Sequence, residues 1–403
     1  MADVGANGPL TGYRVLDLAQ PIGYHCGKLL GDMGAEVIKI ERPGGDPARL
    51  TPPYKDQVPG PERSLYFLHY NTNKRGVTLD IASPDGRELF LELVRHADVV
   101  IETAKPGTMA TLGLGYETLA AVNPAIIMSA ITPFGQTGPW REYKATDIAG
   151  LALGNPMAIS GEPGLEPLQA PGELAYGMAS TYGAFGIAVA LYHRMESGAG
   201  QYIDVSMDES AAHIAGYAIP HYSHEGVKPY RSSRGADVVD LYDAYRTKNG
   251  FVRLFIIPAE QWRNLVRWMG DPDPLTDPIF ENFEFRRQNT DVVHGTIQEF
   301  CLRFTKEELY EEGQKRHIGV SPVNTPVEFI NSAHTKARGV FVDMEHPVIG
   351  NYKQFGPVPR FSGSPGRLVR SAPLVGQDNE AVFCGELGLS KRDLAALTAA
   401  RVI

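Results

Sequence analysis

The sequence has few cysteines and no close grouping of metal-binding side chains. Its 403 residues include only Cys26, Cys301 and Cys384, which are far apart. A disulfide framework or a cysteine-based metal site would need more cysteines at closer spacing. No His-x-x-x-His spacing occurs among the 11 histidines, so we expect no metal site. Isolated thiols are typical of the cytoplasm, where we expect this protein to act.

Signals of three other protein classes are missing as well. The net charge of -9 and the lack of any Lys/Arg run argue against nucleic-acid binding. The turn "AQPIGYHCG", after the first predicted strand, lacks the Gly-x-Gly-x-x-Gly spacing of NAD-binding turns. The absence of a Gly-x-Ser-x-Gly elbow weakens the case for a serine hydrolase. An anionic small molecule would therefore need a local basic pocket.

Evidence for membrane attachment is weak. The amino-terminal stretch "MADVGANGPLTGYRVLDLAQ" has no basic segment followed by an apolar one, as a secretory signal would. The run "LAYGMASTYGAFGIAVAL" (174–191) is barely long enough to span a membrane and is rich in small residues. It predicts a helix buried inside the protein, and no membrane partner is expected.

The first half of the chain alternates strand and helix patterns. Helices are expected at 24–33, closed by Gly34, and from Ser83-Pro84 to 97, with short pieces at 108–114 and 116–123. Strands are expected at 13–19, 36–41, 76–81, 98–102, 125–131 and 200–207. Repeated βαβ units at this spacing predict an α/β fold with a mostly parallel, doubly wound sheet.

The second half has a different pattern. Residues 219–335 carry most of the later aromatics and a charged helix, "TKEELYEEGQKR", and predict a smaller α+β domain. The tail from Pro347 is rich in Pro and Gly and ends in a helix that Ser390 can cap. We therefore divide the chain at 218/219 and 335/336.

One carboxylate stands alone before the apolar run. Glu173 follows Pro171-Gly172, and the next Asp, Glu, Lys or Arg is Arg194. In a first helical turn it would meet unpaired N–H groups and the positive end of the helix dipole. It should then stay ionised and could act as a nucleophile or base. Acids are also favoured in any first turn, so position alone leaves an ordinary structural role open.

Three cations have two possible roles each. Arg42 follows the second strand, where a guanidinium suits a phosphorylated ribose or a pyrophosphate, but it could equally be a surface residue paired with a neighbouring acid. Lys74 and Lys144 could bind an anion or remain solvated, as most lysines do.

Blocks spread from end to end resemble the class III CoA-transferases, the family of formyl-CoA, carnitine and benzylsuccinate CoA-transferases and α-methylacyl-CoA racemase. They include "LLGDMGAEVIKIERPGGDPAR", "NTNKRGVTLDIASPDGRELFLELVRHADVVIE", "FGQTGPW" and "SGAGQYIDVSMDESA". The resemblance implies a Rossmann-like large domain built from both chain ends, 1–218 and 336–403, with 219–335 as an inserted small domain. It also implies two interlocked subunits.

The family's chemistry uses an Asp nucleophile that forms a mixed anhydride and then an enzyme-bound CoA thioester. Glu173, ahead of Gly177-Met178, matches the position of that Asp. Coenzyme A is a substrate in this scheme, and no tightly bound cofactor is expected. The resemblance assigns CoA binding to Arg42, Lys144, Gln20, Ile22, Thr103 and Ala104.

Departures from the family pattern keep several hypotheses open. Thr111 stands where some members have a CoA-binding arginine, and "RSSRGADVVD" (231–240) lacks the glycines of the formyl-CoA transferase lid. The chain is an active transferase with Glu173 as nucleophile, one subunit of a heteromer whose partner carries the Asp, or a non-catalytic CoA-binding or structural subunit. A racemase is least favoured, because Thr146-Asp147 replaces that branch's His-Asp pair.

The substrates follow only by analogy with the family. Succinyl-CoA is the expected donor, and an aromatic or dicarboxylic acid such as benzylsuccinate is the expected acceptor. Tyr217, Tyr222 and Tyr230 could line a substrate pocket or pack in a core.

Overall fold

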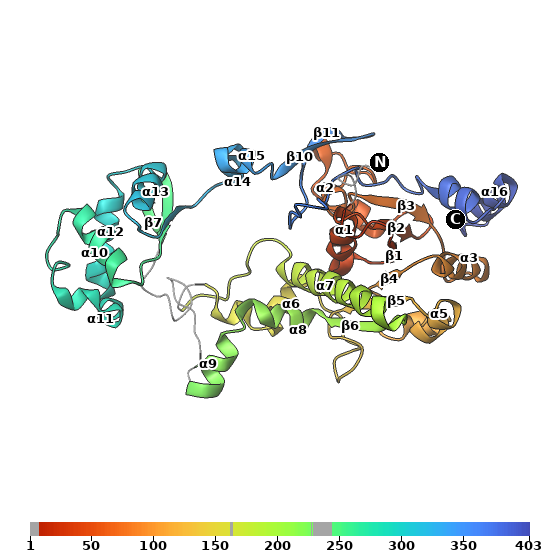
Figure 1. Ribbon diagram of the computed structural model, residues 1–403, viewed down its shortest axis with the longest axis horizontal. Coiled ribbons are helices and arrows are strands. Elements are labelled where there is room, and N and C mark those ends of the chain that lie inside the picture. Colours follow the sequence, from red (N-terminus) through yellow and green to blue (C-terminus); the bar gives the residue numbers. More distant parts are fainter. Residues whose placement is uncertain (1–7, 162–163, 227, 229–243) are drawn as a thin grey trace. The chain divides into compact units, whose positions relative to one another are not determined.

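The computed structural model describes residues 8–161, 164–226, 228 and 244–403 (Figure 1). The chain forms two compact units: Met1–Gly154, Pro171–Ile214 and His334–Ile403 make unit 1, and Asn155–Ala170 and Ala215–Ala333 make unit 2. The segment Asn155–Ala170, which the sequence placed in the first domain, thus groups with unit 2. Tyr230 and the segment 231–240, which lacks the lid glycines, lie outside the described residues.

Unit 1 is built on a six-stranded sheet in the order β3-β2-β1-β4-β5-β6, with every pair parallel. This confirms the predicted α/β fold. The strands are β1 (Arg14–Asp17), β2 (Glu36–Glu41), β3 (Lys74–Thr78), β4 (Val99–Glu102), β5 (Ile127–Thr132) and β6 (Tyr202–Ser206). The chain order reverses between β1 and β4, where crevices for ligands form in open α/β sheets.

Helices cover both faces of this sheet. One face packs against α1 (Tyr24–Asp32) and α7 (Leu174–Ser197), and the other against α3 (Pro84–Arg95) and α5 (Tyr116–Val122). Ser83 caps α3 through a hydrogen bond from the N–H of Gly86, as the Ser-Pro pair predicted. The shorter helices of unit 1 are α2 (Leu65–Tyr70), α4 (Thr108–Thr111), α6 (Asp147–Leu153) and α8 (Met207–Ala212).

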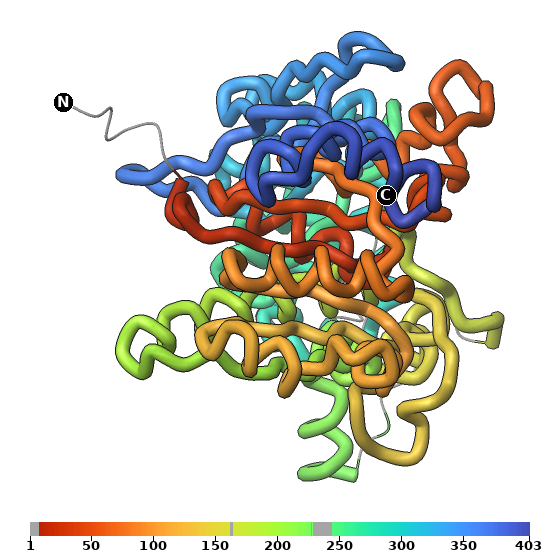
Figure 2. The backbone as a smooth tube through the Cα atoms, turned by 90° about the vertical axis from the view of Figure 1, so that its right-hand side faces the viewer, coloured from red at the N-terminus to blue at the C-terminus, as the bar shows by residue number. Residues whose placement is uncertain are grey.

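The carboxyl-terminal part of the chain completes this unit without adding a strand to the sheet. The Asp378 side chain accepts a hydrogen bond from the N–H of Gly76, and the Val402 carbonyl accepts one from the N–H of Asp80. Phe383 and Ile403 join the core between the sheet and α3. Figure 2 shows this last segment lying along the first strands. The segment includes a π-helix (Glu380–Glu386), α16 (Lys391–Ala399), capped by Ser390, and the hairpin β10 (Phe341–His346) and β11 (Gly350–Phe355).

Helix α7 is the one described helix that is long and apolar enough to cross a membrane. Its small residues instead let it approach the sheet closely, because a Cβ on Gly183 would lie 2.7 Å from Cδ1 of Ile131. Only this side is buried, whereas Phe185, Val189 and Tyr192 on the other side are exposed. The prediction of a helix that packs within the protein therefore holds for one face of α7.

Unit 2 has an antiparallel sheet of β7 (Ala244–Thr247), β8 (Gly250–Leu254) and β9 (Val320–Pro322). Its core centres on Trp262, with Ile297 and Leu309 contributed by two other helices. The helices are α9 (Ala218–Glu225), α10 (Ala259–Met269), α11 (Phe283–Gln288), α12 (Thr290–Cys301), α13 (Lys306–Lys315), α14 (Pro326–Asn331) and α15 (Ala333–Ala337), the last of which lies at the boundary with unit 1. This combination is the α+β arrangement that the sequence suggested.

A buried ion pair holds the loop after β2. Arg49 donates to both carboxylate oxygens of Glu41, at 2.6 and 2.7 Å, and to the carbonyl of Pro373, and its guanidinium lies over the ring of Phe67. Both members of the pair are almost completely buried, whereas Arg42, seven residues earlier, is exposed. Arg49 therefore joins the loop to the returning carboxyl-terminal segment.

Replacing Arg49 with Met leaves the buried Glu41 carboxylate without its main partner. Breaking a buried pair in this way costs about 3–5 kcal/mol, so R49M should lower the free energy of unfolding by that order. The exposed Arg42→Met is the matched control, with an expected change within about 0.5 kcal/mol. Denaturant unfolding at one fixed protein concentration measures both, and equal losses in the two variants would contradict this role of Arg49.

Candidate active site

Several of the predicted site residues lie together where β1 and β4 end. Gln20 follows β1, and its N–H donates to Oγ1 of Thr103, which follows β4, at 2.9 Å. Ile22 is buried on the same turn, and its carbonyl accepts a hydrogen bond from Ser180 of α7 at 2.8 Å. The N–H of Ala104 donates to the Glu102 carboxylate at 2.6 Å. These contacts join the turns at the strand-order reversal to helix α7.

Glu173 lies at the start of α7 but does not cap it. It occupies the N-cap position, and its side chain makes no capping hydrogen bond. Asp147, the first residue of α6, takes that role: its Oδ1 accepts a hydrogen bond from the N–H of Tyr176 at 2.9 Å. The prediction that Glu173 belongs to the first helical turn and meets its free N–H groups was therefore wrong. A carboxylate from another helix satisfies them, and the Glu173 side chain is left free to turn elsewhere.

Two tyrosines of α2 hold the Glu173 carboxylate. The hydroxyl of Tyr66 lies 2.8 Å from Oε2 and 3.1 Å from Oε1, and donates a hydrogen bond to the carboxylate. Tyr70, one turn further along α2, adds a weaker hydrogen-bonding interaction. The two rings pack edge to face with centroids 5.1 Å apart. The carboxylate is thus half-buried in a largely aromatic setting.

The surroundings of Glu173 raise its pKa. Burial is the main cause, the hydrogen bond from Tyr66 opposes the rise, and the negative charge of Asp147 adds to it. This direction differs from the expectation that the helix dipole would favour the ionised form. Burial also raises the pKa of Tyr70 to about 12 and that of Tyr66 further, so both phenols stay protonated and can donate at neutral pH.

Two buried ion pairs lie beneath the turns at this edge of the sheet. Lys74 is completely buried and pairs with Asp17 at 2.8 Å, and its ammonium also donates to the carbonyl of Tyr24. Gly27 makes room for the pair, since a Cβ there would lie 2.3 Å from Oδ2 of Asp17. Lys39 pairs with Asp46 at 3.3 Å beside it. Of the alternatives left open for Lys74, the solvated one is therefore wrong.

The remaining candidates are surface residues at the same edge. Arg42 follows β2 and Lys144 lies between β5 and α6, and both are exposed. Thr111 donates its hydroxyl to the carbonyl of Gly107 within α4. Lys105, which sequence reasoning missed, follows Ala104 and pairs with Glu142 at 2.6 Å on the surface. Lys105 stands directly before Pro106-Gly107. It is six residues before Thr111, the position where some family members have a CoA-binding arginine.

The contacts of Glu173 were not predicted, and they differ in how far the sequence could have indicated them. Tyr66 and Tyr70 stand four residues apart in "LYFLHY", the spacing of one helix face, so the short helix α2 was detectable in principle. The contact between Tyr66 and Glu173, which are 107 residues apart, was not detectable from the sequence. No grouping of His, Cys, Asp or Glu suited to a metal ion occurs among the described residues.

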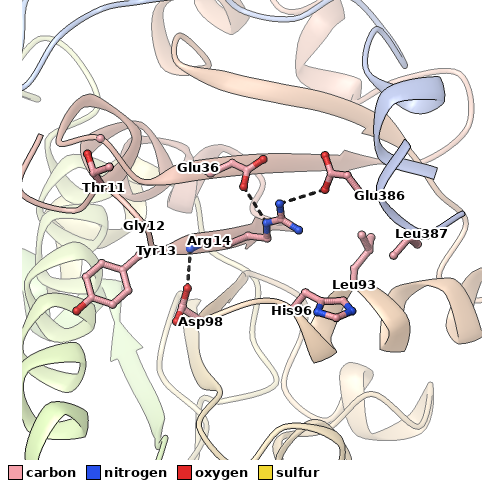
Figure 3. Close-up of a pocket in the computed structure, with 11 residues that line it drawn as sticks. Thr11, Gly12, Tyr13, Arg14, Glu36, Leu93, His96, Asp98, Glu386 and Leu387 are labelled. Carbon is pink, nitrogen blue, oxygen red and sulfur yellow. Dashed lines mark hydrogen bonds and ion pairs between the residues drawn. The ribbon is translucent and has the colours of Figure 1, made fainter. Parts of the chain in front are cut away.

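A depression of about 650 Å³ lies at the opposite edge of the sheet (Figure 3). Arg14 crosses it and bonds to Glu36 and Glu386, and its N–H donates to Asp98. Arg14, Glu36 and Asp98 stand at or next to the starts of strands, whereas Gln20 follows the end of β1. Arg75 also pairs with Glu36 and Glu386, and Arg194 pairs with Asp98, so the three carboxylates are matched by three arginines. This depression therefore ties the chain's two ends together and is not the candidate site.

Comparisons with known proteins agree on one family. The model of CoA-transferase family III matches residues 10–379. A succinyl-CoA–D-citramalate CoA-transferase of Chloroflexus aurantiacus is 34% identical over 400 residues, covering 98% of each chain. Subunit BbsE of the succinyl-CoA:(R)-benzylsuccinate CoA-transferase of Thauera aromatica is 31% identical over 390 residues, covering 93% of each. A CaiB/BaiF family protein from Brucella suis superposes with a TM-score of 0.84 at 29% identity, covering 94% of this chain and 99% of that one.

The Tyr66 hydrogen bond makes a direct prediction about Glu173. Because the phenol stabilises the ionised carboxylate, Tyr66→Phe should raise the pKa of Glu173 above its already raised value. Carbon-13 NMR of labelled glutamate carboxyls measures this, with Glu173→Gln identifying the signal. Tyr116→Phe, which removes a phenol that does not face Glu173, is the control. A fall in the pKa in Tyr66→Phe would contradict the hydrogen-bond assignment.

Proposed function

Because the chain belongs to CoA-transferase family III, we propose that it moves coenzyme A from succinyl-CoA to a carboxylic acid, with Glu173 as the covalent nucleophile. The observation that carries this proposal is the Glu173 carboxylate itself. It is not used as a helix cap, and it is half-buried and held by Tyr66. A carboxylate held only for stability would more simply have bonded to the N–H groups at the start of its own helix, which Asp147 takes instead.

The proposed reaction conserves the energy of the thioester bond. The Glu173 carboxylate attacks the thioester carbonyl of the donor; a C–O bond forms, the C–S bond breaks, and CoA leaves as a thiolate. The thiolate then attacks the Glu173 carbonyl of the mixed anhydride and releases the donor acid as a carboxylate. The acceptor carboxylate attacks the resulting glutamyl-CoA thioester, and the CoA thiolate returns to the acceptor carbonyl. Glu173 is regenerated without any net proton transfer.

The longer side chain of Glu173, compared with the family's Asp, fits the position of α2. Tyr66 meets the carboxylate at hydrogen-bond distance as it stands, one methylene further from the backbone than an Asp would place it. The retained geometry supports an active site adapted to glutamate rather than one that has lost its nucleophile.

Basic groups at the same sheet edge support binding of the CoA phosphates. Arg42, Lys105 and Lys144 follow β2, β4 and β5 respectively, and each is exposed to solvent. We assign the diphosphate to this set, together with the backbone of the turn that holds Gln20 and Ile22. In this assignment Lys105 takes the place of the arginine that is absent at Thr111.

A dicarboxylic acid is the proposed acceptor. The names of the two relatives given above concern D-citramalate and (R)-benzylsuccinate, which both carry two carboxylates. One carboxylate would react at Glu173, and the other would have to be bound by a second polar or cationic group.

A second candidate is that this chain acts as one subunit of a larger enzyme. One relative is named as a subunit, and the exposed apolar side of α7, with Phe185, Val189 and Tyr192, suits a face covered by another chain. Either a second copy of this chain or a paralogue that carries the family's Asp nucleophile could cover this face. The racemase reading is weaker, because Thr146 has no ionisable group and Asp147 caps α7.

The chain purified alone should form a glutamyl-CoA adduct when it is mixed with succinyl-CoA. Intact mass spectrometry should show the added mass of CoA, borohydride or hydroxylamine should modify Glu173, and Glu173→Gln should show neither. An adduct that forms only on a co-purified paralogue would favour the heteromer. Absence of an adduct in every assembly would leave the non-catalytic account.

Restoring the family's residue should lower activity rather than raise it. Glu173→Asp withdraws the carboxylate from Tyr66, and a misplacement near 1 Å costs on the order of a hundredfold in rate. We expect kcat/KM with succinyl-CoA and a dicarboxylic acceptor to fall about tenfold or more, measured by chromatography of the CoA esters, with an unchanged thermal midpoint. Equal or higher activity in E173D would show that the site is not adapted to glutamate.

A further inference from the structure

Asp147 belongs to α6 but serves the start of α7. Its Oδ1 accepts the hydrogen bond from the N–H of Tyr176, and the N–H of Ala175 also stabilises its carboxylate. Asp147 is only 7% exposed. Its other oxygen, Oδ2, is buried and has no hydrogen-bond partner among the described residues. A buried carboxylate with one unpaired oxygen is costly, so a purely structural cap does not account for it.

The charge of Asp147 acts on Glu173. The groups that face the Glu173 carboxylate are Tyr66 and Tyr70 from α2, Tyr176 from α7 and Asp147 from α6. The pKa values of the three tyrosines are raised, so these phenols stay neutral, and Asp147 is the one carboxylate of this set besides Glu173. Burial raises the pKa of Asp147, and the hydrogen bonds from the N–H groups of Tyr176 and Ala175 oppose that rise by stabilising its ionised form. The charge of that form has the same sign as that of the Glu173 carboxylate. Two like charges that share a partly buried site repel each other.

We propose that Asp147 is a positioning residue that drives covalent catalysis: it keeps Glu173 off the helix start and destabilises the free carboxylate relative to the covalent intermediates. The proposal rests on the function proposed above. In the mixed anhydride and in the glutamyl-CoA thioester, Glu173 carries no charge, so the repulsion from Asp147 is relieved when the first C–O bond forms. The repulsion returns only when the acceptor has taken CoA and the carboxylate is free again.

The same geometry explains why the cap comes from another helix. If the Glu173 side chain bonded to the free N–H groups at the start of α7, they would stabilise its carboxylate and make it a poorer nucleophile. Asp147 occupies those N–H groups and presents a negative charge instead. The N–H groups at the start of α7 therefore no longer stabilise the Glu173 carboxylate. The negative charge of Asp147 instead raises the free energy of that carboxylate.

Asp147→Asn separates the two roles, because asparagine caps helices about as well as aspartate but carries no charge. With the full chain and succinyl-CoA plus succinate at fixed concentrations, intact mass spectrometry gives the fraction of chains that carry CoA. We expect the ratio of adduct to free chain to fall about tenfold in D147N, the order of effect expected from one like charge removed from a partly buried pair. Carboxyl NMR should show a lower pKa of Glu173 in D147N than in the wild type.

Asp208→Asn is the matched control, since Asp208 on α8 is also partly buried but does not face Glu173. It should change neither the adduct ratio nor the pKa of Glu173. An unchanged pKa of Glu173 in D147N, or an unchanged adduct ratio alongside normal adduct formation in the wild type, overturns the charge proposal alone. Absence of adduct in the wild type overturns the proposed function and this proposal together.

Discussion

The hydrogen bond from the N–H of Tyr176 to Asp147 is the contact on which the candidate site depends. A helix start offers free N–H groups, and the nearest carboxylate usually takes them. Here a residue of another helix takes them, and the Glu173 carboxylate turns toward Tyr66. In the proposed reaction Asp147 is the structural carboxylate and Glu173 is the reactive one.

The parallel sheet connects this helix start to the turns that we propose bind CoA. All the sheet's strands are parallel, so the turns after β1, β2, β4 and β5 gather at one edge, and α7 is joined to that edge by the bond between Ser180 and Ile22. Buried pairs such as Asp17 with Lys74 and Glu41 with Arg49 fix these turns from within. The returning carboxyl-terminal segment contacts the loop after β2 through the carbonyl of Pro373, which bonds to Arg49, and the edge strand β3 through Asp378, which bonds to Gly76.

Local sequence rules predicted the elements well and the site only in part. The strand Glu36–Glu41 and the caps Ser83 and Ser390 follow from patterns within a few residues, and the structure has them where they were expected. Asp147 was noticed only as half of a dipeptide, because the N–H that it caps lies 29 positions further on. Lys74 looked like any solvated lysine, since its partner Asp17 belongs to another strand. Arg42 and Arg49 share one loop, and nothing in that loop's sequence indicated which of them would be buried.

An oxygen-transfer measurement tests the central claim, that Glu173 itself carries the acyl group, most directly. With an acceptor acid labelled with oxygen-18 in its carboxylates, the acceptor oxygen bridges the mixed anhydride and stays on Glu173 when CoA leaves for the acceptor carbonyl. Each labelled turnover puts one acceptor oxygen on Glu173 and removes one Glu173 oxygen with the donor acid, so after many turnovers both carboxylate oxygens of Glu173 should be heavy, read by mass spectrometry of the peptide that contains it. Formation of the acceptor's CoA ester by this chain without label at Glu173 would contradict the account.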